Sequence, residues 1–152
     1  MAIKVWDYLK EYEHEKEEIL AAIEKVLNSG CLILGDSVKN FEDAFAAYCS
    51  VRFGVGVNSG TDALFLGLRA LGIGAGDEVI TVANTAVPTV SAIVSTGATP
   101  RFVDIDPETY LMDTAMLERT ITGKTKCILP VHLYGQCVNM SSVSKIAGAS
   151  GL

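Results

Sequence analysis

The feature that most constrains the fold is an alternation of short apolar runs with helical patterns, which begins near residue 53 and continues to the end of the sequence. We predict strands at 53–57, 77–82, 99–103 and 127–131, and helices at 61–71, 88–95, 114–119 and 141–149. Such alternation is typical of a parallel sheet, because a crossover helix carries the chain back to the edge where the next strand starts. The sequence therefore predicts the α/β class. In the helix at 61–71 we expect Leu64, Leu68 and Leu71 to face inward.

Two amphipathic helices are predicted ahead of this alternation. Apolar side chains recur at helical spacing from Tyr8 to Leu27, and Gly30 follows where a glycine commonly ends a helix. A second helix runs to Tyr48 after a cap at Asp36 or Ser37. We expect a helical segment at 1–52 and a sheet-containing segment at 53–152, which together form one structural domain.

Charge and composition exclude several classes of partner. The formal net charge of −6 gives no positive surface for nucleic acid or an anionic membrane. No run approaches the roughly 18 uninterrupted apolar residues of a membrane span. A zinc site is not expected, because the four cysteines form no CxxC pair and only two histidines could join them. We expect a cytoplasmic protein with free thiols, bound to no metal, membrane or nucleic acid.

The stretch VGVNSGTDALFLGLRAL, residues 55–71, carries the chemical signal. A predicted strand ends and a helix begins within four residues, so Ser59, Gly60, Thr61 and Asp62 place backbone amides at a helix start. Amides and a helix dipole at one point attract an anion, and a glycine lets a ligand approach closely, which is typical of phosphate binding. The alternative is a plain capping box, in which Ser59 caps the helix and Asp62 reaches back to its amide. The two interpretations are compatible.

A second glycine-rich stretch, GIGAGD at 72–77, does not predict a dinucleotide site. The GxGxxG fingerprint follows a strand and opens a helix, whereas these glycines follow a predicted helix and open a strand.

Several strings in fixed order resemble the DegT/StrS family of sugar-nucleotide aminotransferases, over about residues 8–152. They are SGCLILGDSVKNFEDAFAAYC at 29–49, SGTDAL at 59–64, ALGIGAGDEVI at 70–80, GATPRFVDIDPETYLMD at 97–113 and TKCILPVHLYGQ at 125–136.

The resemblance implies a truncated form of the large domain of type I aminotransferases that use pyridoxal 5′-phosphate (PLP), with three layers in the order α/β/α. It also implies a homodimer, with amino transfer from a donor such as glutamate to a keto-sugar bound to a nucleotide. Gly60, Thr61 and Asp62 match the turn that holds the PLP phosphate in the family, in agreement with the reasoning from the residues.

Other positions are carried over with less support. Many family members have an aromatic residue that stacks on the PLP ring where this chain has Ala86, which cannot stack. Another side chain then covers the ring, or the site is open to a bulkier substrate, or the copy is degraded. Ser59, Asn84 and His132 are further candidates for the pocket. His132 follows a predicted strand at the ligand-binding edge, although a lone histidine is more often structural and held by a backbone partner.

The resemblance places the two catalytic groups beyond Leu152. These are the lysine that bonds to the cofactor and the aspartate that contacts its ring nitrogen. Lys124, Lys126 and Lys145 match no family lysine, so the chain alone is expected to be inactive. A PLP-dependent sugar dehydratase and a non-catalytic remnant or assembly partner remain as alternatives. An open sheet edge is also expected, and with it a tendency to associate.

Overall fold

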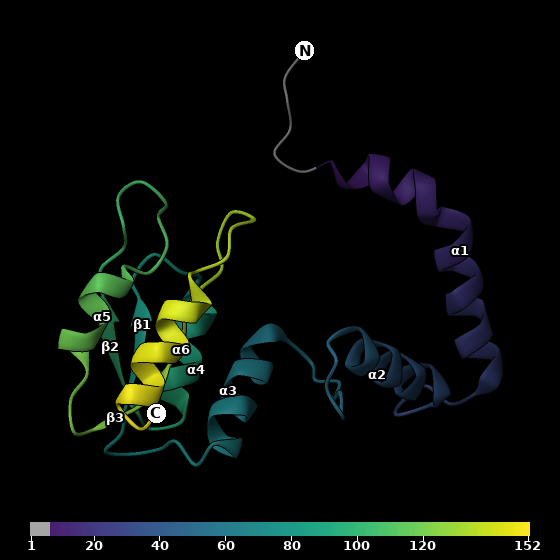
Figure 1. Ribbon diagram of the computed structural model, residues 1–152. Coiled ribbons are helices and arrows are strands. Elements are labelled where there is room, and N and C mark those ends of the chain that lie inside the picture. Colours follow the sequence, from purple (N-terminus) through teal and green to yellow (C-terminus); the bar gives the residue numbers. More distant parts are fainter. Residues whose placement is uncertain (1–6) are drawn as a thin grey trace. The chain divides into compact units, whose positions relative to one another are not determined.

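The computed structural model describes residues 7–152. The chain divides into two compact units, Met1–Gly56 and Val57–Leu152, and each is described by itself. The first unit is helical, and the second contains the described sheet (Figure 1). Within residues 7–152, no helix has the length and apolar character that crossing a membrane requires.

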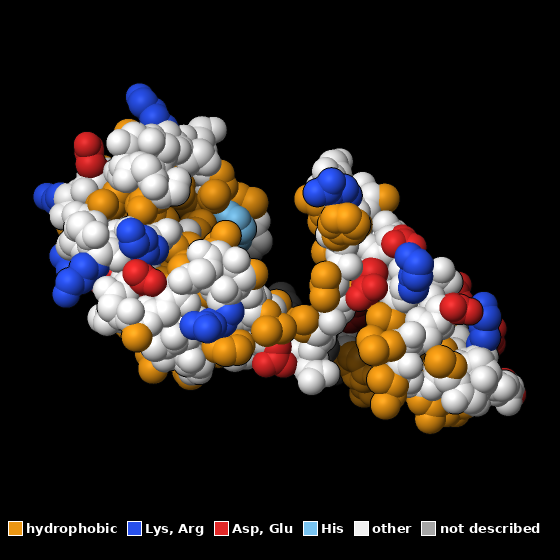
Figure 2. Space-filling view, turned by 90° about the horizontal axis from the view of Figure 1, so that it is seen from below, with side chains coloured by type: hydrophobic (Ala, Val, Ile, Leu, Met, Phe, Trp, Pro, Cys, Tyr) orange, Lys and Arg blue, Asp and Glu red, His pale blue; other side chains and the backbone are white. Residues whose placement is uncertain are grey.

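Two helices make up most of the first unit. α1 spans Tyr8–Ser29 and ends at Gly30, whose left-handed φ of 69° lets its amide donate to the Leu27 carbonyl. α2 spans Asp36–Tyr48. Among the described residues of these two helices only Ala46 is buried, and Figure 2 shows hydrophobic side chains gathered on the surface of this unit. The first unit therefore has little core of its own.

The strand predicted at 53–57 is absent, so this prediction is wrong. The segment is attached to α2 instead, because the Glu42 carboxylate accepts a hydrogen bond of 2.6 Å from the Gly56 amide. Gly54 approaches the same residue so closely that a Cβ there would lie 2.6 Å from the Glu42 carbonyl oxygen. A strand needs a neighbour to pair its backbone groups, and none of the described strands pairs with this segment.

Three parallel strands form the sheet of the second unit, β1 (Glu78–Val82), β2 (Thr99–Val103) and β3 (Thr125–Ile128), in the order β2-β1-β3. The predictions for β1 and β2 are confirmed to within one residue. β3 lies earlier than the predicted 127–131. The Leu129 amide still donates to the Ile80 carbonyl, but Pro130 has no amide with which to continue the pairing.

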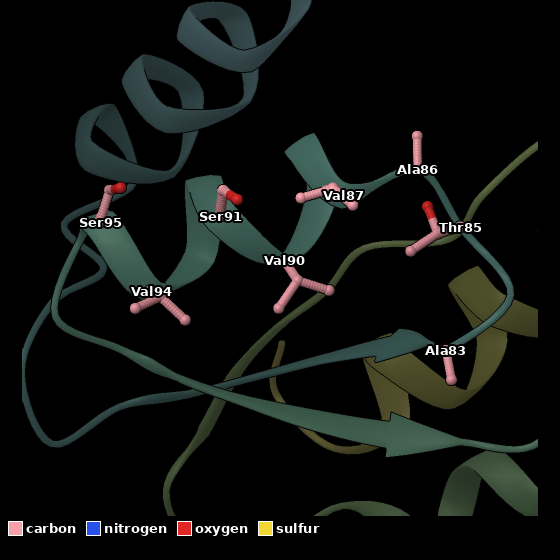
Figure 3. A pocket seen from close by; sticks show the side chains of 8 residues that line it. All are labelled: Ala83, Thr85, Ala86, Val87, Val90, Ser91, Val94 and Ser95. Atoms are coloured by element: carbon pink, nitrogen blue, oxygen red, sulfur yellow. The ribbon is translucent and has the colours of Figure 1, made fainter.

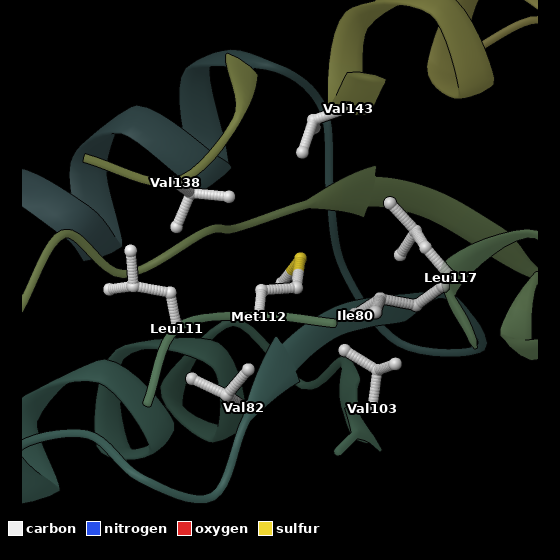
Figure 4. Packing of buried hydrophobic residues seen from close by; sticks show 8 residues of the cluster. All are labelled: Ile80, Val82, Val103, Leu111, Met112, Leu117, Val138 and Val143. Atoms are coloured by element: carbon white, nitrogen blue, oxygen red, sulfur yellow. The ribbon is translucent and has the colours of Figure 1, made fainter. Parts of the chain in front are cut away.

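Two pairs of helices cover the sheet, one pair on each face, and complete the predicted three layers (Figure 1). α3 (Gly60–Ala70) and α4 (Val87–Ser95) lie on the face where Val79 of β1 is buried. The other face is covered by α5 (Thr114–Thr120) and α6 (Met140–Ala149), which contribute Leu117 and Val143 to the buried cluster drawn in Figure 4. The cluster on that face comprises Ile80, Val82, Val103, Leu111, Met112, Leu117, Val138 and Val143.

The inward face of α3 differs from the prediction at its carboxyl end. Leu68 is 4% exposed and Leu64 is half-buried, as expected for core-facing positions. Leu71, however, is 73% exposed, and Ile73 is only 2% exposed. α3 ends before Leu71, and Gly72 turns the chain at a φ of 79°, so the helical period no longer applies there. The prediction that Leu71 faces inward is therefore wrong.

Candidate functional site

The carboxyl ends of the parallel strands bring three loops to one edge of the sheet. β1 leads into residues 83–86, β2 into 104–113 and β3 into 129–139. α3 packs beside α4 and leads through the turn at 71–77 to the start of β1, so its amino end is directed toward the same edge (Figure 1). This edge is named the carboxyl edge. Ligands of α/β sheets bind at such an edge.

The amino end of α3 presents two free backbone donors. Ser59 precedes the helix in an extended conformation, with φ −157° and ψ 163°. Within the described part of the chain, the amides of Gly60 and Thr61 donate to no protein acceptor, and neither does the Thr61 hydroxyl. A Cβ placed on Gly60 would meet no atom within 4 Å. Both amides are therefore open to a ligand.

The helix cap at this turn is only half of a capping box. The Ser59 hydroxyl accepts a hydrogen bond of 3.1 Å from the Asp62 amide. The return bond, from the Ser59 amide to the Asp62 carboxylate, is not made among residues 7–152. Capping thus consumes the third amide of the helix and leaves the first two unused. The predicted return bond of the capping box is therefore wrong, whereas the geometry leaves two amides available for the predicted anion.

An open pocket of about 560 Å³ runs along α4, beginning at the loop that follows β1. Ala86 lies at the start of this helix, in an extended conformation, and contributes only a methyl group (Figure 3). Val90 and Val94 project from the same side of α4 in that view. The full lining is Ala83, Thr85, Ala86, Val87, Val90, Ser91, Val94 and Ser95. The pocket is apolar along the helix, with hydroxyl groups among its lining residues.

Asn84 does not offer a free side chain to this pocket. Its amide nitrogen Nδ2 donates a hydrogen bond of 3.2 Å to the Tyr110 carbonyl. Asn84 therefore joins the loop after β1 to the loop after β2.

His132 lies exposed in the loop after β3. Its Nδ1 accepts a hydrogen bond of 3.1 Å from the Val138 amide, which closes the loop 132–138 around left-handed Tyr134 and Gly135. Because Nδ1 is the acceptor, the neutral ring carries its proton on Nε2. The ring therefore has a structural partner, and Nε2 is the nitrogen left to face solvent.

The carboxyl edge carries no cationic side chain of its own in the loops 83–86, 104–113 and 129–139 or in the turn 59–62. Lys124 lies at the opposite edge, where its carbonyl accepts from the Glu78 amide. Lys126 lies within β3, and Lys145 lines a groove of about 370 Å³ between α5 and α6. In residues 7–152, no group of His, Cys, Asp and Glu side chains could hold a metal ion. An anion here would depend on amides and the helix dipole.

Sequence reasoning missed the part of the edge built around Tyr110. The Asp106-Pro107 turn is visible in the sequence, but the left-handed tyrosine four residues after Asp106 is not. Its contact with Asn84 spans 26 residues, so no local pattern could have shown it.

Comparison with known proteins agrees with this architecture. The model of the DegT/DnrJ/EryC1/StrS aminotransferase family matches residues 13–152. A dTDP-3-amino-3,4,6-trideoxy-alpha-D-glucose transaminase of Micromonospora megalomicea subsp. nigra is 53% identical over 152 residues, which are 100% of this chain and 41% of that protein. A pleiotropic regulatory protein of Geobacillus stearothermophilus is 45% identical over the same share of each chain. The chain thus spans about two fifths of the length of these relatives.

Solved structures show the same fold. DesV of S. venezuelae, in complex with a ketimine intermediate, matches with a TM-score of 0.93 at 44% identity, over 96% of this chain and 39% of that one. NtdA from Bacillus subtilis, with bound cofactor PMP (pyridoxamine 5′-phosphate), matches with a TM-score of 0.88 at 40% identity. That match covers 91% of this chain and 32% of the NtdA chain. The structural neighbours of the present chain are thus aminotransferases that use PLP or PMP.

Proposed function

The chain belongs to the DegT/DnrJ/EryC1/StrS aminotransferase family, and from this membership we propose that it forms the phosphate-holding part of a PLP-dependent sugar aminotransferase. The proposed acceptor is a keto-sugar linked to a nucleotide, supported by relatives named for dTDP- and UDP-linked sugars. The proposed amino donor is glutamate, which the name of one Bacillus subtilis relative contains. We also propose a homodimer in the cytoplasm as the working form.

The observation that carries the proposal is the pair of unused amides at Gly60 and Thr61. A phosphate group fits this turn, because both amides and the Thr61 hydroxyl are free and Gly60 adds no side chain to obstruct it. The dipole of α3, an 11-residue helix, adds partial positive charge at the same point. The edge has no lysine or arginine, so further charge compensation would come from another segment or a second copy.

The residues of this chain have binding and orienting roles in the proposal. Gly60 and Thr61 hold the phosphate, and Ser59 keeps the turn extended while it caps the helix. Asn84 and His132 keep the neighbouring loops in place through their backbone partners. When bound, PLP supplies an electron sink for the transfer of an amino group.

We propose that the chain on its own does not catalyse amino transfer. That reaction needs a lysine that bonds to the cofactor and a carboxylate at the ring nitrogen. The lysines of the second unit lie at the opposite sheet edge, within β3 or in the α5–α6 groove, and none is in the loops of the carboxyl edge.

One observation favours a second candidate, a non-catalytic assembly partner. Ala86 occupies the position at which the family resemblance places a stacking aromatic residue, and its side chain is a single methyl. An assay distinguishes these two candidate functions. The part of a relative that this chain does not match is added to the chain as a separate polypeptide, and amino transfer is measured. Recovery of amino transfer would support a true half-enzyme, and silence in a complex that does form would support the assembly role.

The binding proposal is tested with pyridoxamine 5′-phosphate, which lacks the aldehyde that reacts with surface lysines. We expect the phosphorus NMR signal of this compound to shift on titration with the chain, and Thr61→Val to weaken the affinity several-fold by removing one hydroxyl donor. Inorganic phosphate should compete, whereas pyridoxamine without its phosphate should not. Equal binding of pyridoxamine with and without phosphate would contradict a phosphate site.

The inactivity proposal is tested by incubating the chain with PLP and glutamate. We expect no 2-oxoglutarate above a protein-free control. Its formation at a rate proportional to the concentration of the chain would contradict the proposal.

A further inference from the structure

The loop between β3 and α6 contains a tight turn at its tip. The backbones of Tyr134 and Gly135 are both left-handed, with φ of 56° and 75°. Across them, the Gln136 amide donates a hydrogen bond of 3.0 Å to the Leu133 carbonyl. Two successive residues of positive φ that are closed in this way are typical of a type I′ turn. In Figure 1 this loop extends beyond the amino end of α6.

The imidazole ring of His132 closes the base of the loop. Its Nδ1 accepts a hydrogen bond of 3.1 Å from the amide of Val138, six positions further along the chain. Val138 is anchored, because its side chain is only 3% exposed and belongs to the core cluster beneath α5 and α6. The residues at 134–137, in contrast, are exposed. The loop is therefore closed by a contact between a fixed backbone amide and an exposed side chain.

Protonation of the ring would turn this contact from attractive to repulsive. The neutral ring offers a lone pair at Nδ1, whereas the protonated ring carries a hydrogen on both nitrogens. The N–H at Nδ1 would then face the N–H of Val138, and that amide has no other acceptor in residues 7–152. A buried amide without an acceptor is costly, so the loop would have to open to let water reach it. Histidine is the side chain that most readily gains its proton between about pH 8 and about pH 5.

Other charged groups around the loop do not take part in this contact. The loops of the carboxyl edge and the helices α5 and α6 carry the titratable side chains Asp104, Asp106, Glu108, Tyr110, Asp113, Glu118, Arg119, Tyr134, Cys137 and Lys145. Within the described residues, none of them forms a hydrogen bond or an ion pair with His132. The Val138 amide is therefore the described group whose bond to the ring depends on the ring's charge.

We propose that His132 acts as a pH-sensitive switch for the loop 132–138. The neutral ring holds the loop closed through Val138, and the protonated ring releases it, so the closed loop is favoured at higher pH and lost as the pH falls. Release also loosens the carboxyl edge, because the Gln136 side chain in this loop donates to the Thr109 carbonyl at 3.5 Å. The switch is a property of the loop itself and does not depend on the proposed cofactor.

The test follows the Val138 amide and the His132 ring in one NMR titration of the full chain, from about pH 8 to about pH 5.5. Each amide exchange rate is divided by that of an unstructured peptide at the same pH, which removes the intrinsic effect of pH on exchange. His132→Asn is the matched variant, because its side-chain oxygen replaces Nδ1 by an acceptor that does not titrate. The Ser142 amide is the internal control, since it donates to the Asn139 side chain over the same 3.1 Å.

We expect the protection of the Val138 amide to fall about fivefold as the His132 ring takes up its proton, as for loss of one hydrogen bond. The ring signals and the protection of Val138 should change over the same pH range, whereas the protection of Ser142 should change less. In His132→Asn, the protection of Val138 should stay constant throughout the titration.

Two results would overturn the inference. One is unchanged protection of Val138 while the ring signals show that His132 has become protonated. The other is an equal fall in the unmodified chain and in His132→Asn, which would show that another group causes the pH dependence. If His132→Asn does not fold, the titration of the unmodified chain decides alone, because the first result needs no variant.

Discussion

The two edges of the sheet differ in how their polar groups are used. At the edge where the strands begin, polar groups satisfy one another. The Glu78 carboxylate accepts a hydrogen bond of 2.6 Å from the Thr122 hydroxyl, and Arg101 lies 3.9 Å from it while donating to the Thr120 carbonyl. Asp77 accepts from the Gly74 amide at 2.9 Å in the turn that leads into β1.

At the carboxyl edge, side chains such as Asn84 and His132 have protein partners, but other polar groups do not. The amides of Gly60 and Thr61 have no acceptor in the described residues, and Tyr110 and Tyr134 have left-handed backbones with exposed side chains. An open pocket begins at Ala86. The difference indicates that the edge where the strands begin contributes mainly to stability, whereas the unpaired amides at the carboxyl edge are the groups that the proposed phosphate would use.

The largest expected effect on stability comes from a substitution at the edge where the strands begin. Glu78→Ala should lower the free energy of unfolding by about 2 kcal/mol, because the Thr122 hydroxyl and Arg101 lose a charged partner. Urea unfolding measures the loss, and Glu78→Gln, which keeps an acceptor oxygen, should lose less. The affinity for pyridoxamine 5′-phosphate should stay the same. A large loss of affinity would show that the edges are not separate in function.

The reciprocal change lies at the carboxyl edge. Asn84→Ala should cost about 1 kcal/mol of stability, as expected for a single neutral hydrogen bond, but should weaken ligand binding several-fold because the loop after β1 loses its tie to the loop after β2. Titration calorimetry and urea unfolding on the same samples separate the two effects. Gln136→Ala serves as the control, since its bond is 3.5 Å long and its removal should change both quantities less. If Asn84→Ala and Gln136→Ala changed affinity and stability equally, the Asn84 bond would have no special role at the carboxyl edge.

The smallest expected effect is a pH dependence in the turn that carries Tyr110. Bonds from the amides of Thr109 and Glu108 and from the Thr109 hydroxyl lower the pKa of Asp106 from its ordinary 3.8. The unfolded chain then takes up this proton first as the pH falls. The contribution to stability is therefore complete above the ordinary pKa and is lost as the pH drops through the lower folded value.

Asp106→Asn removes the titrating group and keeps an acceptor oxygen. Urea unfolding from about pH 5 to about pH 2.5 should show a shallower fall in stability for this variant than for the unmodified chain. If the stability of both proteins fell in parallel with pH, the predicted pH dependence would not come from Asp106.

Local patterns were sufficient where an element depends on its own residues. The helix that begins at Tyr8 and the strands at Glu78–Val82 and Thr99–Val103 follow from periodicity and turn residues. The segment 53–57 has the same apolar pattern but forms no strand, because pairing depends on a neighbour that the pattern does not reveal. Leu71 was misplaced for a related reason, since the helix stops one residue before it.

The candidate site also has one part that local sequence signals predict and another part that they do not. The turn from Ser59 to Asp62 was predictable, because capping residues and a glycine at a helix start are local signals. The pairing of Asn84 with Tyr110 and of His132 with Val138 depends on how three loops meet after the sheet has formed. Only the structure could show that these side chains face loop backbones.

The most direct test of the phosphate site compares two glycines of α3. A Cβ would meet nothing within 4 Å at either Gly60 or Gly67, so alanine fits both positions in the protein. The quantity to be measured is the affinity of each variant for pyridoxamine 5′-phosphate, by phosphorus NMR. Gly60→Ala should bind about tenfold more weakly, as for loss of one hydrogen bond to a charged group, because its methyl hinders approach to the free amides. Gly67→Ala should bind as the unmodified chain does and gain about 0.5–1 kcal/mol of stability. Equal affinities of the two variants would contradict a phosphate site at the amino end of α3.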